Sequence, residues 1–220
     1  MNDNVAKNLE RWDRTHDWRA DGDEWNRQAA ACGIDYASWK QSLVDHLIAP
    51  HAAPGRHALE IAPGHGRWTE YLAALFGHVT AVDLSPSCIA FCRQRFASRT
   101  NIDFAVTDGV SLPDVEADFV FSFDAFVHMD RGVIGAYLKE IARVLRSRAS
   151  AVLHHSNVAD FDAHDQERAQ GWRAPMTAQL FASLADEAGL EVVSQRVFWD
   201  EKNRIGVPRL GDRISELRKP

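Results

Sequence analysis

A tight, glycine-bearing turn at residues 62–67 is the first feature of this chain that suggests chemistry. It follows an apolar run at 57–62, carries Gly64 and Gly66, and leads directly into a segment at 67–76 that favours a helix. Glycines let the backbone approach a ligand closely, and the first turn of a helix offers unpaired N–H groups. The pattern therefore predicts a binding site for a nucleotide-like ligand.

Three carboxylates lie at or near the ends of predicted strands. Glu60 precedes the glycine turn, Asp83 follows about twenty residues later, and Asp108 stands before Gly109. A carboxylate at the position of Asp83 can accept hydrogen bonds from both ribose hydroxyls of a cofactor. A nicotinamide-binding turn has a third glycine, whereas this chain has Thr69 there, so the pattern does not favour a nicotinamide cofactor.

Histidines follow two further strands and are candidates for a catalytic base, because the imidazole pKa lies near neutral pH. His128 comes shortly after the fourth predicted strand, and His154 and His155 close the fifth. Alternation along a strand places these two neighbours on opposite faces. We expect His155, next to Ser156 and Asn157, to point into the site, and His154 to be a hydrogen-bonded rim residue.

The elements that must position these residues alternate between strand and helix. Near-continuous apolar strands separated by helical segments predict an α/β fold, a doubly wound, Rossmann-like parallel sheet with helices on both faces. In such sheets a ligand binds beyond the carboxyl ends of the strands, where the strand order reverses. We expect strands at 57–62, 78–83, 102–107, 117–123, 150–155, 190–199 and 214–217, and helices at 35–49, 67–76, 86–97, 131–146 and 177–188.

Two regions are expected along the chain: a helical cap at 1–50 and the sheet domain at 51–220. The cap carries Trp12, Trp18 and Trp25. We expect it to fold over the ligand as a lid that excludes water. Alternatively, the tryptophans only attach the segment to the core.

Composition limits the classes of function. A chain of 220 residues with 45% hydrophobic residues is typical of a globular protein, and its net charge of −6 argues against an extended surface for nucleic acid, which would need a basic face. No apolar run has the length of a membrane span. Three cysteines, Cys32, Cys88 and Cys92, form no disulfide framework and predict reduced thiols and a cytoplasmic location. The oligomeric state is left open.

Several motifs in order resemble those of the class I S-adenosylmethionine-dependent methyltransferases. The resemblance covers roughly residues 55–200, and the ordered set is far more specific than any single motif. It also includes a helix that ends in Arg-Val-Leu-Arg before the fifth strand. The matching runs are Leu-Glu-Ile-Ala-Pro-Gly-His-Gly at 59–66, Val-Thr-Ala-Val-Asp-Leu-Ser at 79–85, Thr-Asp-Gly at 107–109 and Ala-Asp-Phe-Val-Phe-Ser-Phe-Asp at 117–124.

The resemblance implies S-adenosylmethionine as the cofactor and assigns it contacts. Asp83 would hold the ribose hydroxyls, Asp108 would accept from the adenine amino group, and Phe123 with Asp124 would border the sulfonium. The chain departs from the family at Ala62, where a glycine is common. The full set of expected cofactor contacts is Glu60, Ala62, Gly64, Gly66, Trp68, Asp83, Leu84, Asp108, Gly109, Phe123, Trp18 and Trp25.

The expected reaction is methyl transfer to a hydroxyl or amine of a small molecule, with His128, His155 and Asp124 as catalytic residues. A narrower resemblance, to small bacterial methyltransferases of carbohydrate and natural-product biosynthesis, suggests a sugar or aminosugar acceptor, such as an aminoglycoside-like compound. The alternatives are methyl transfer to a protein or RNA, a non-catalytic cofactor-binding protein and a nicotinamide oxidoreductase.

A metal site is a further alternative, because magnesium prefers carboxylate ligands and some sugar and catechol methyltransferases use it. The histidines and aspartates that suggest such a site show no compact ligand spacing, so we expect no metal. They are His154, His155, Asp160, Asp162, His164 and Asp165.

Overall fold

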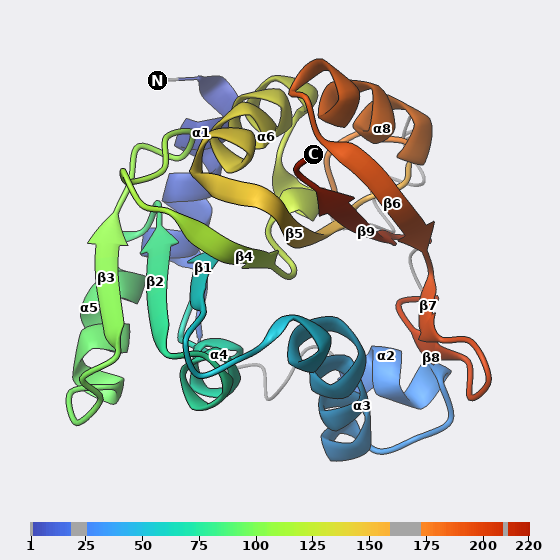
Figure 1. Cartoon of the computed structure of the whole chain (residues 1–220), viewed down its shortest axis with the longest axis horizontal. Helices are drawn as coiled ribbons and strands as arrows, with labels where there is room; N and C mark the ends of the chain where they lie inside the picture. The colour runs from blue at the N-terminus through green and yellow to red at the C-terminus, as the bar shows by residue number, and fades with distance from the viewer. Residues whose placement is uncertain (1, 19–25, 159–172, 209–210) are drawn as a thin grey trace.

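The computed structural model describes residues 2–18, 26–158, 173–208 and 211–220. Within them a seven-stranded sheet has the order β3-β2-β1-β4-β5-β9-β6, and a two-stranded sheet is formed by β7 and β8 (Figure 1). The strands are β1 (His57–Ile61), β2 (His78–Asp83), β3 (Ile102–Val106), β4 (Ala117–Ser122), β5 (Leu145–His155), β6 (Glu191–Arg196), β7 (Phe198–Asp200), β8 (Ile205–Gly206) and β9 (Arg213–Arg218).

The first five strands of the large sheet run parallel. In register, Glu60 of β1 lies beside Ala81 of β2 and Phe121 of β4, so the carboxyl ends of these strands meet at one edge. The chain order reverses between β1 and β4, which creates the crevice where such folds bind ligands. β9 is antiparallel to both β5 and β6 and lies between them. The predicted fold class is confirmed, apart from this antiparallel strand.

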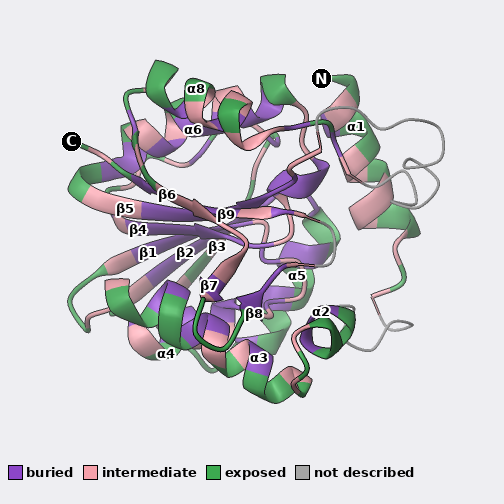
Figure 2. Ribbon diagram, turned by 90° about the vertical axis from the view of Figure 1, so that its right-hand side faces the viewer, coloured by how far each residue is buried: buried purple, intermediate pink, exposed green. Residues whose placement is uncertain are grey.

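Helices cover both faces of the sheet (Figure 2). One face packs against α6 (Arg131–Val144) and α8 (Ala178–Glu187), and the other against α3 (Tyr36–Leu43) and α4 (Thr69–Leu75). Alternation along β1 divides its side chains between the two layers. The first layer includes Leu59, Ile61, Ile134, Leu138 and Phe181, and the second includes Ala58, Trp39, Leu43 and Leu72.

α5 (Pro86–Arg95) follows β2, and its start is defined by local sequence. The hydroxyl of Ser85 accepts a hydrogen bond from the backbone N–H of Cys88, and Pro86 occupies the first helical position, where it has no N–H to leave unpaired. Asp83, the last residue of β2, and Leu84 therefore lie immediately before a fixed helix start.

The N-terminal residues divide into two parts. α1 (Asp3–Leu9) and a π-helical turn (Glu10–Thr15) lie at the carboxyl ends of the strands, whereas α2 (Asn26–Ala31) and α3 lie beside the β7–β8 hairpin (Figure 1). The Trp39 indole N–H donates to the Gly206 carbonyl at 2.9 Å. Helical structure after α3 continues through Val44–Ile48 to Ala49–His51. The boundary at residue 50 stays a prediction.

Two strand predictions differ markedly from the structure. β5 begins at Leu145 rather than at 150, because its exposed first residues are held by backbone bonds to the chain end, such as Arg148 N–H to Lys219 O at 2.8 Å. The run predicted at 190–199 is split into β6 and β7. Within the described residues no helix combines the length and apolarity needed to cross a bilayer, and the three cysteines are free thiols.

Candidate cofactor and acceptor site

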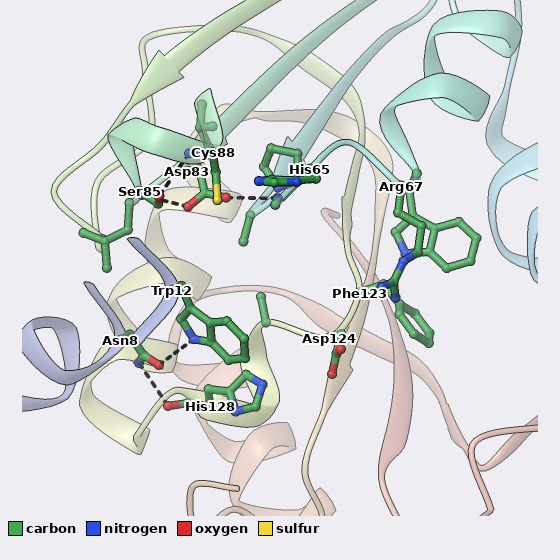
Figure 3. A pocket seen from close by; sticks show the side chains of 18 of the residues that line it. Asn8, Trp12, His65, Arg67, Asp83, Ser85, Cys88, Phe123, Asp124 and His128 are labelled. Carbon is green, nitrogen blue, oxygen red and sulfur yellow. Dashed lines mark hydrogen bonds between the residues drawn. The ribbon is translucent and has the colours of Figure 1, made fainter. Parts of the chain in front are cut away.

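A pocket of about 350 Å³ lies at the carboxyl ends of β1, β2 and β4 (Figure 3). Its walls come from the glycine turn, the ends of these strands and the N-terminal segment. Of the residues singled out from the sequence, the walls contain Trp18, Ala62, Gly64, Trp68, Asp83, Leu84, Gly109, Phe123, Asp124 and His128.

The glycine turn and Asp83 form one hydrogen-bonded unit. The Asp83 carboxylate accepts from the backbone N–H of Gly64 at 3.1 Å and from that of Ser85 at 2.8 Å. These bonds use two of its roughly four lone-pair positions, which leaves acceptors for two hydroxyls. Burial raises the pKa of Asp83 to about 6, so the group is ionised at neutral pH. The arrangement suits recognition of a ribose.

Ala62, the residue at which the chain departs from the family, has a backbone conformation that favours glycine. Ala62 has φ +59° and Gly64 has φ +55°, both in the left-handed region that favours glycine. The Ala62 N–H donates to the Val82 carbonyl at 2.7 Å, which holds the alanine in this conformation. The substitution is thus tolerated with the turn geometry intact.

The N-terminal segment covers the turn. Trp18 stacks on His65 with ring centroids 4.6 Å apart, and its indole N–H donates to the Trp12 carbonyl at 3.1 Å. Asp13 accepts from the Ser85 hydroxyl at 2.7 Å and from the Ser87 N–H at 2.9 Å, which ties this segment to the start of α5. Sequence reasoning missed Asp13, because one aspartate in an acidic stretch gives no signal. The wall residues from this segment are Val5, Asn8, Leu9, Trp12 and Trp18.

A second part of the pocket lies around His128. This residue ends a short 3₁₀ helix (Phe126–His128), and its ring lies beside Trp12 with centroids 4.8 Å apart (Figure 3). The amides of Asn4 and Asn8 both donate to the His128 carbonyl at 3.1 Å. These bonds hold the backbone of His128 at the pocket wall, where Asp124 also lies. This part carries the groups that could accept a proton.

Glu60, Gly66 and Asp108 do not line this pocket, and their contacts with the cofactor stay predictions. Glu60 is buried beneath the turn and accepts from the Thr69 hydroxyl at 2.6 Å; burial raises its pKa to about 8. Gly66 faces the ring of Phe96. Asp108 is exposed and accepts from the N–H groups of its own turn, which lower its pKa.

His155 does not line the pocket either, and its catalytic role stays a prediction. It is fully buried, stacks on Phe181 with centroids 3.8 Å apart, and bonds to the Ser215 hydroxyl at 2.7 Å. The predicted alternation holds, but it directs the neighbour, His154, toward the pocket wall. His154 stacks on Phe123 at 4.4 Å, so it lies behind that wall rather than in the cavity.

Some candidates lie outside the described residues. Trp25 is one, and so are the acidic and histidine residues considered for a metal: Asp160, Asp162, His164 and Asp165. Across the part of the chain that the structure describes, no cluster of three or more His, Cys, Asp or Glu side chains could hold a metal ion.

Residues 58–148 match the family model described as a methyltransferase domain. Over 96 residues the chain is 36% identical to a probable phthiotriol/phenolphthiotriol dimycocerosates methyltransferase of Mycobacterium ulcerans, covering 42% of this chain and 36% of that protein. Over 88 residues it is 33% identical to a ubiquinone biosynthesis O-methyltransferase of Xanthomonas campestris, covering 40% and 36%. The matches thus span about a third of these curated relatives.

Solved structures share the fold over the whole chain. The N-methyltransferase NodS of Bradyrhizobium japonicum, crystallised with S-adenosylhomocysteine, has a TM-score of 0.67 at 20% identity and covers 99% of this chain and 100% of its own. The geranyl diphosphate C-methyltransferase of Streptomyces coelicolor has a TM-score of 0.74 at 11% identity, covering 100% and 99%. At these identities the likeness concerns the fold.

Proposed function

We propose that the chain is a class I S-adenosylmethionine-dependent methyltransferase, as the match of residues 58–148 to a methyltransferase domain supports, and that it methylates an amine or hydroxyl of a small molecule, in particular a sugar or aminosugar. The observation that carries the proposal is a single pocket that joins Asp83 and the glycine turn to Asp124 and His128. One half suits the cofactor, and the other suits a polar acceptor. The match to a methyltransferase domain, and the similar fold of a methyltransferase solved with S-adenosylhomocysteine, support S-adenosylmethionine as the cofactor.

The cofactor half fits a nucleoside. Asp83 would accept from the ribose hydroxyls, because its carboxylate is held by Gly64 and Ser85 with lone pairs left over. Leu84 would lie against the adenine. Gly109 lies beside it: a Cβ built on Gly109 would come within 3.1 Å of the Leu84 side chain. The missing side chain at Gly109 thus leaves room at this end of the pocket.

In the acceptor half the chain has to align the nucleophile and remove its proton. S-adenosylmethionine, when bound, supplies a methyl group on a sulfonium, which is open to in-line displacement. His128 would take the proton that a hydroxyl or amine loses on attack. Asp124 would accept a hydrogen bond from a neighbouring hydroxyl or amino group and so orient the acceptor.

A sugar-like acceptor fits the side chains around His128. Trp12 presents an aromatic surface beside the imidazole, and Asp124 adds a carboxylate. The apolar face of a sugar would pack on Trp12, and a hydroxyl at its edge would donate to Asp124. A carboxylate also suits an amino substituent, because it attracts a cationic group toward the pocket.

The proposal is tested by transfer of a labelled methyl group from S-adenosylmethionine. The acceptors are amino sugars, neutral glycosides with free hydroxyls, a mixed peptide pool and total RNA, each with the full chain and with Asp83→Ala. We expect labelled product with a sugar or amino sugar, and a much smaller rate for Asp83→Ala. Labelling of peptide or RNA alone would overturn the choice of acceptor. Tight S-adenosylhomocysteine binding without transfer to any acceptor would indicate a non-catalytic binding protein.

A further inference from the structure

Asp124 adopts an unusual backbone conformation in the pocket wall. It follows β4 with φ +66°, in the left-handed region that costs a residue other than glycine free energy. Its backbone N–H donates to Nδ1 of His154 at 3.1 Å, behind the wall. The conformation of a wall residue is thus tied to a buried side chain.

The hydrogen bond from Asp124 fixes the tautomer of His154. A backbone N–H can only donate, so Nδ1 carries no proton and the ring proton lies on Nε2. Nε2 lies 3.2 Å from a carboxylate oxygen of Asp212, which accepts that proton's hydrogen bond. Both side chains are fully buried, and burial lowers the pKa of His154, which keeps the ring neutral.

Arg173 completes the arrangement. Its guanidinium donates to the same Asp212 oxygen at 2.8 Å and lies 4.0 Å from a carboxylate oxygen of Asp124. The buried charge of Asp212 is therefore paired, as a buried carboxylate requires. Burial acts to raise the pKa of Asp212, but the hydrogen bond from His154 and the charge of Arg173 lower it, so the carboxylate stays ionised and accepts from His154.

His154 also holds the residue before Asp124. Its ring stacks on Phe123 with centroids 4.4 Å apart and an interplanar angle of 24°. One imidazole thus contacts the backbone of Asp124 and the ring of Phe123, both of which line the pocket. Neither contact depends on a ligand.

We propose that His154, oriented by Asp212, is a positioning residue that holds Phe123 and Asp124 in the geometry needed for methyl transfer. It acts through these two residues and does not touch the cofactor or the acceptor. Its effect on turnover rests on the proposed function, whereas its tautomer and its effect on cofactor binding do not. Asp212 orients the imidazole by accepting the hydrogen bond from Nε2, the nitrogen that the bond from Asp124 leaves protonated.

The test compares two substitutions at the same site. In His154→Asn the side-chain oxygen lies where Nδ1 stood and can still accept from Asp124, whereas His154→Phe keeps a ring for Phe123 but has no acceptor. His155→Asn is the matched control, because His155 is equally buried but faces Phe181. Calorimetry gives the affinity for S-adenosylhomocysteine, kinetics give kcat and KM, and thermal unfolding gives the Tm of each variant.

We expect His154→Phe to lower kcat and cofactor affinity about tenfold or more, because the partly buried N–H of Asp124 loses its acceptor. His154→Asn should recover most of that loss, and His155→Asn should lower Tm without changing cofactor affinity. Equal losses in His154→Asn and His154→Phe, or losses in all three that follow Tm, would contradict a positioning role.

Nitrogen NMR of the histidine side chains gives a reading that is independent of activity. We expect the unliganded full chain to hold the His154 proton on Nε2. A proton on Nδ1 in the unsubstituted chain would overturn the inference even if methyl transfer is observed. Absence of transfer together with the expected tautomer would instead count against the proposed function alone.

Discussion

The indole of Trp18 lies directly over Gly64: a Cβ built on this glycine would come within 2.8 Å of the Trp18 ring. The N-terminal segment and the glycine turn are therefore fitted to each other, although 46 residues separate them. Because Gly64 has no side chain, the Trp18 ring can lie against the glycine turn. This contact is where the predicted lid would meet the cofactor site.

We predict that Gly64→Ala displaces Trp18 and weakens binding of S-adenosylhomocysteine. The added methyl group collides with the ring, and alanine is also strained at φ +55°. In a double-mutant cycle with Trp18→Ala, the loss caused by Gly64→Ala should be smaller, because the ring is gone. Calorimetry measures the four affinities. The same loss in both backgrounds would show that Trp18 does not cover the site.

Asp83→Ala should weaken binding of S-adenosylhomocysteine by about 1–3 kcal/mol, because the ribose loses hydrogen bonds to a charged group. Asp108→Ala is the control: Asp108 is exposed and bonds within its own turn, so its removal should change affinity little. Calorimetry of both variants checks this pair. If Asp108→Ala weakens binding more than Asp83→Ala does, Asp108 contacts the adenine, as the family resemblance implies, and does not only bond within its own turn.

Replacement of His128 by alanine should lower turnover by about 10²-fold or more, the range for loss of a general base. Cofactor affinity should stay near that of the unsubstituted chain, because the bonds from Asn4 and Asn8 to residue 128 involve only its backbone carbonyl. Steady-state kinetics and calorimetry separate the two effects. Unaltered turnover removes His128 from the proposed chemistry.

Glu60→Gln should change how stability depends on pH. Burial raises the pKa of Glu60 from 4.5 to about 8, so between these values the folded chain holds a proton that the unfolded chain has released. Stability from this group is therefore present at low pH and falls by about 1.4 kcal/mol per unit as pH rises through that window. Glutamine cannot ionise, and its amide oxygen can still accept from Thr69.

Urea unfolding of both proteins at several pH values across this window measures the effect. The stability of Glu60→Gln relative to the unsubstituted chain should increase steadily with pH. A difference that stays constant would mean that Glu60 is ionised in the folded chain.

The sequence predicted the parallel part of the sheet well because its strands are short, apolar and bounded by polar turns. β2 (His78–Asp83) was predicted with the bounds that the structure has. β9 carried too weak a pattern to reveal its place between β5 and β6, since an antiparallel insertion is decided by pairing between distant segments. Local periodicity contains no information on that pairing.

The site was predicted where function requires a residue type at a fixed offset from a turn, as for Gly64 and Asp83. It was not predicted where contacts join distant segments. Asp13 reaches Ser85 and Asp212 reaches His154, 72 and 58 residues apart. Alternation separated His154 from His155 correctly, but the face that points to the pocket depends on strand register, which the sequence alone did not reveal.

Calorimetric titration of the full chain with S-adenosylhomocysteine, and separately with NADH, tests the central claim most directly. The account predicts saturable binding of one S-adenosylhomocysteine per chain, greatly weakened in Asp83→Ala, and no heat of binding with NADH. No binding of S-adenosylhomocysteine, or comparable binding of NADH, would contradict it.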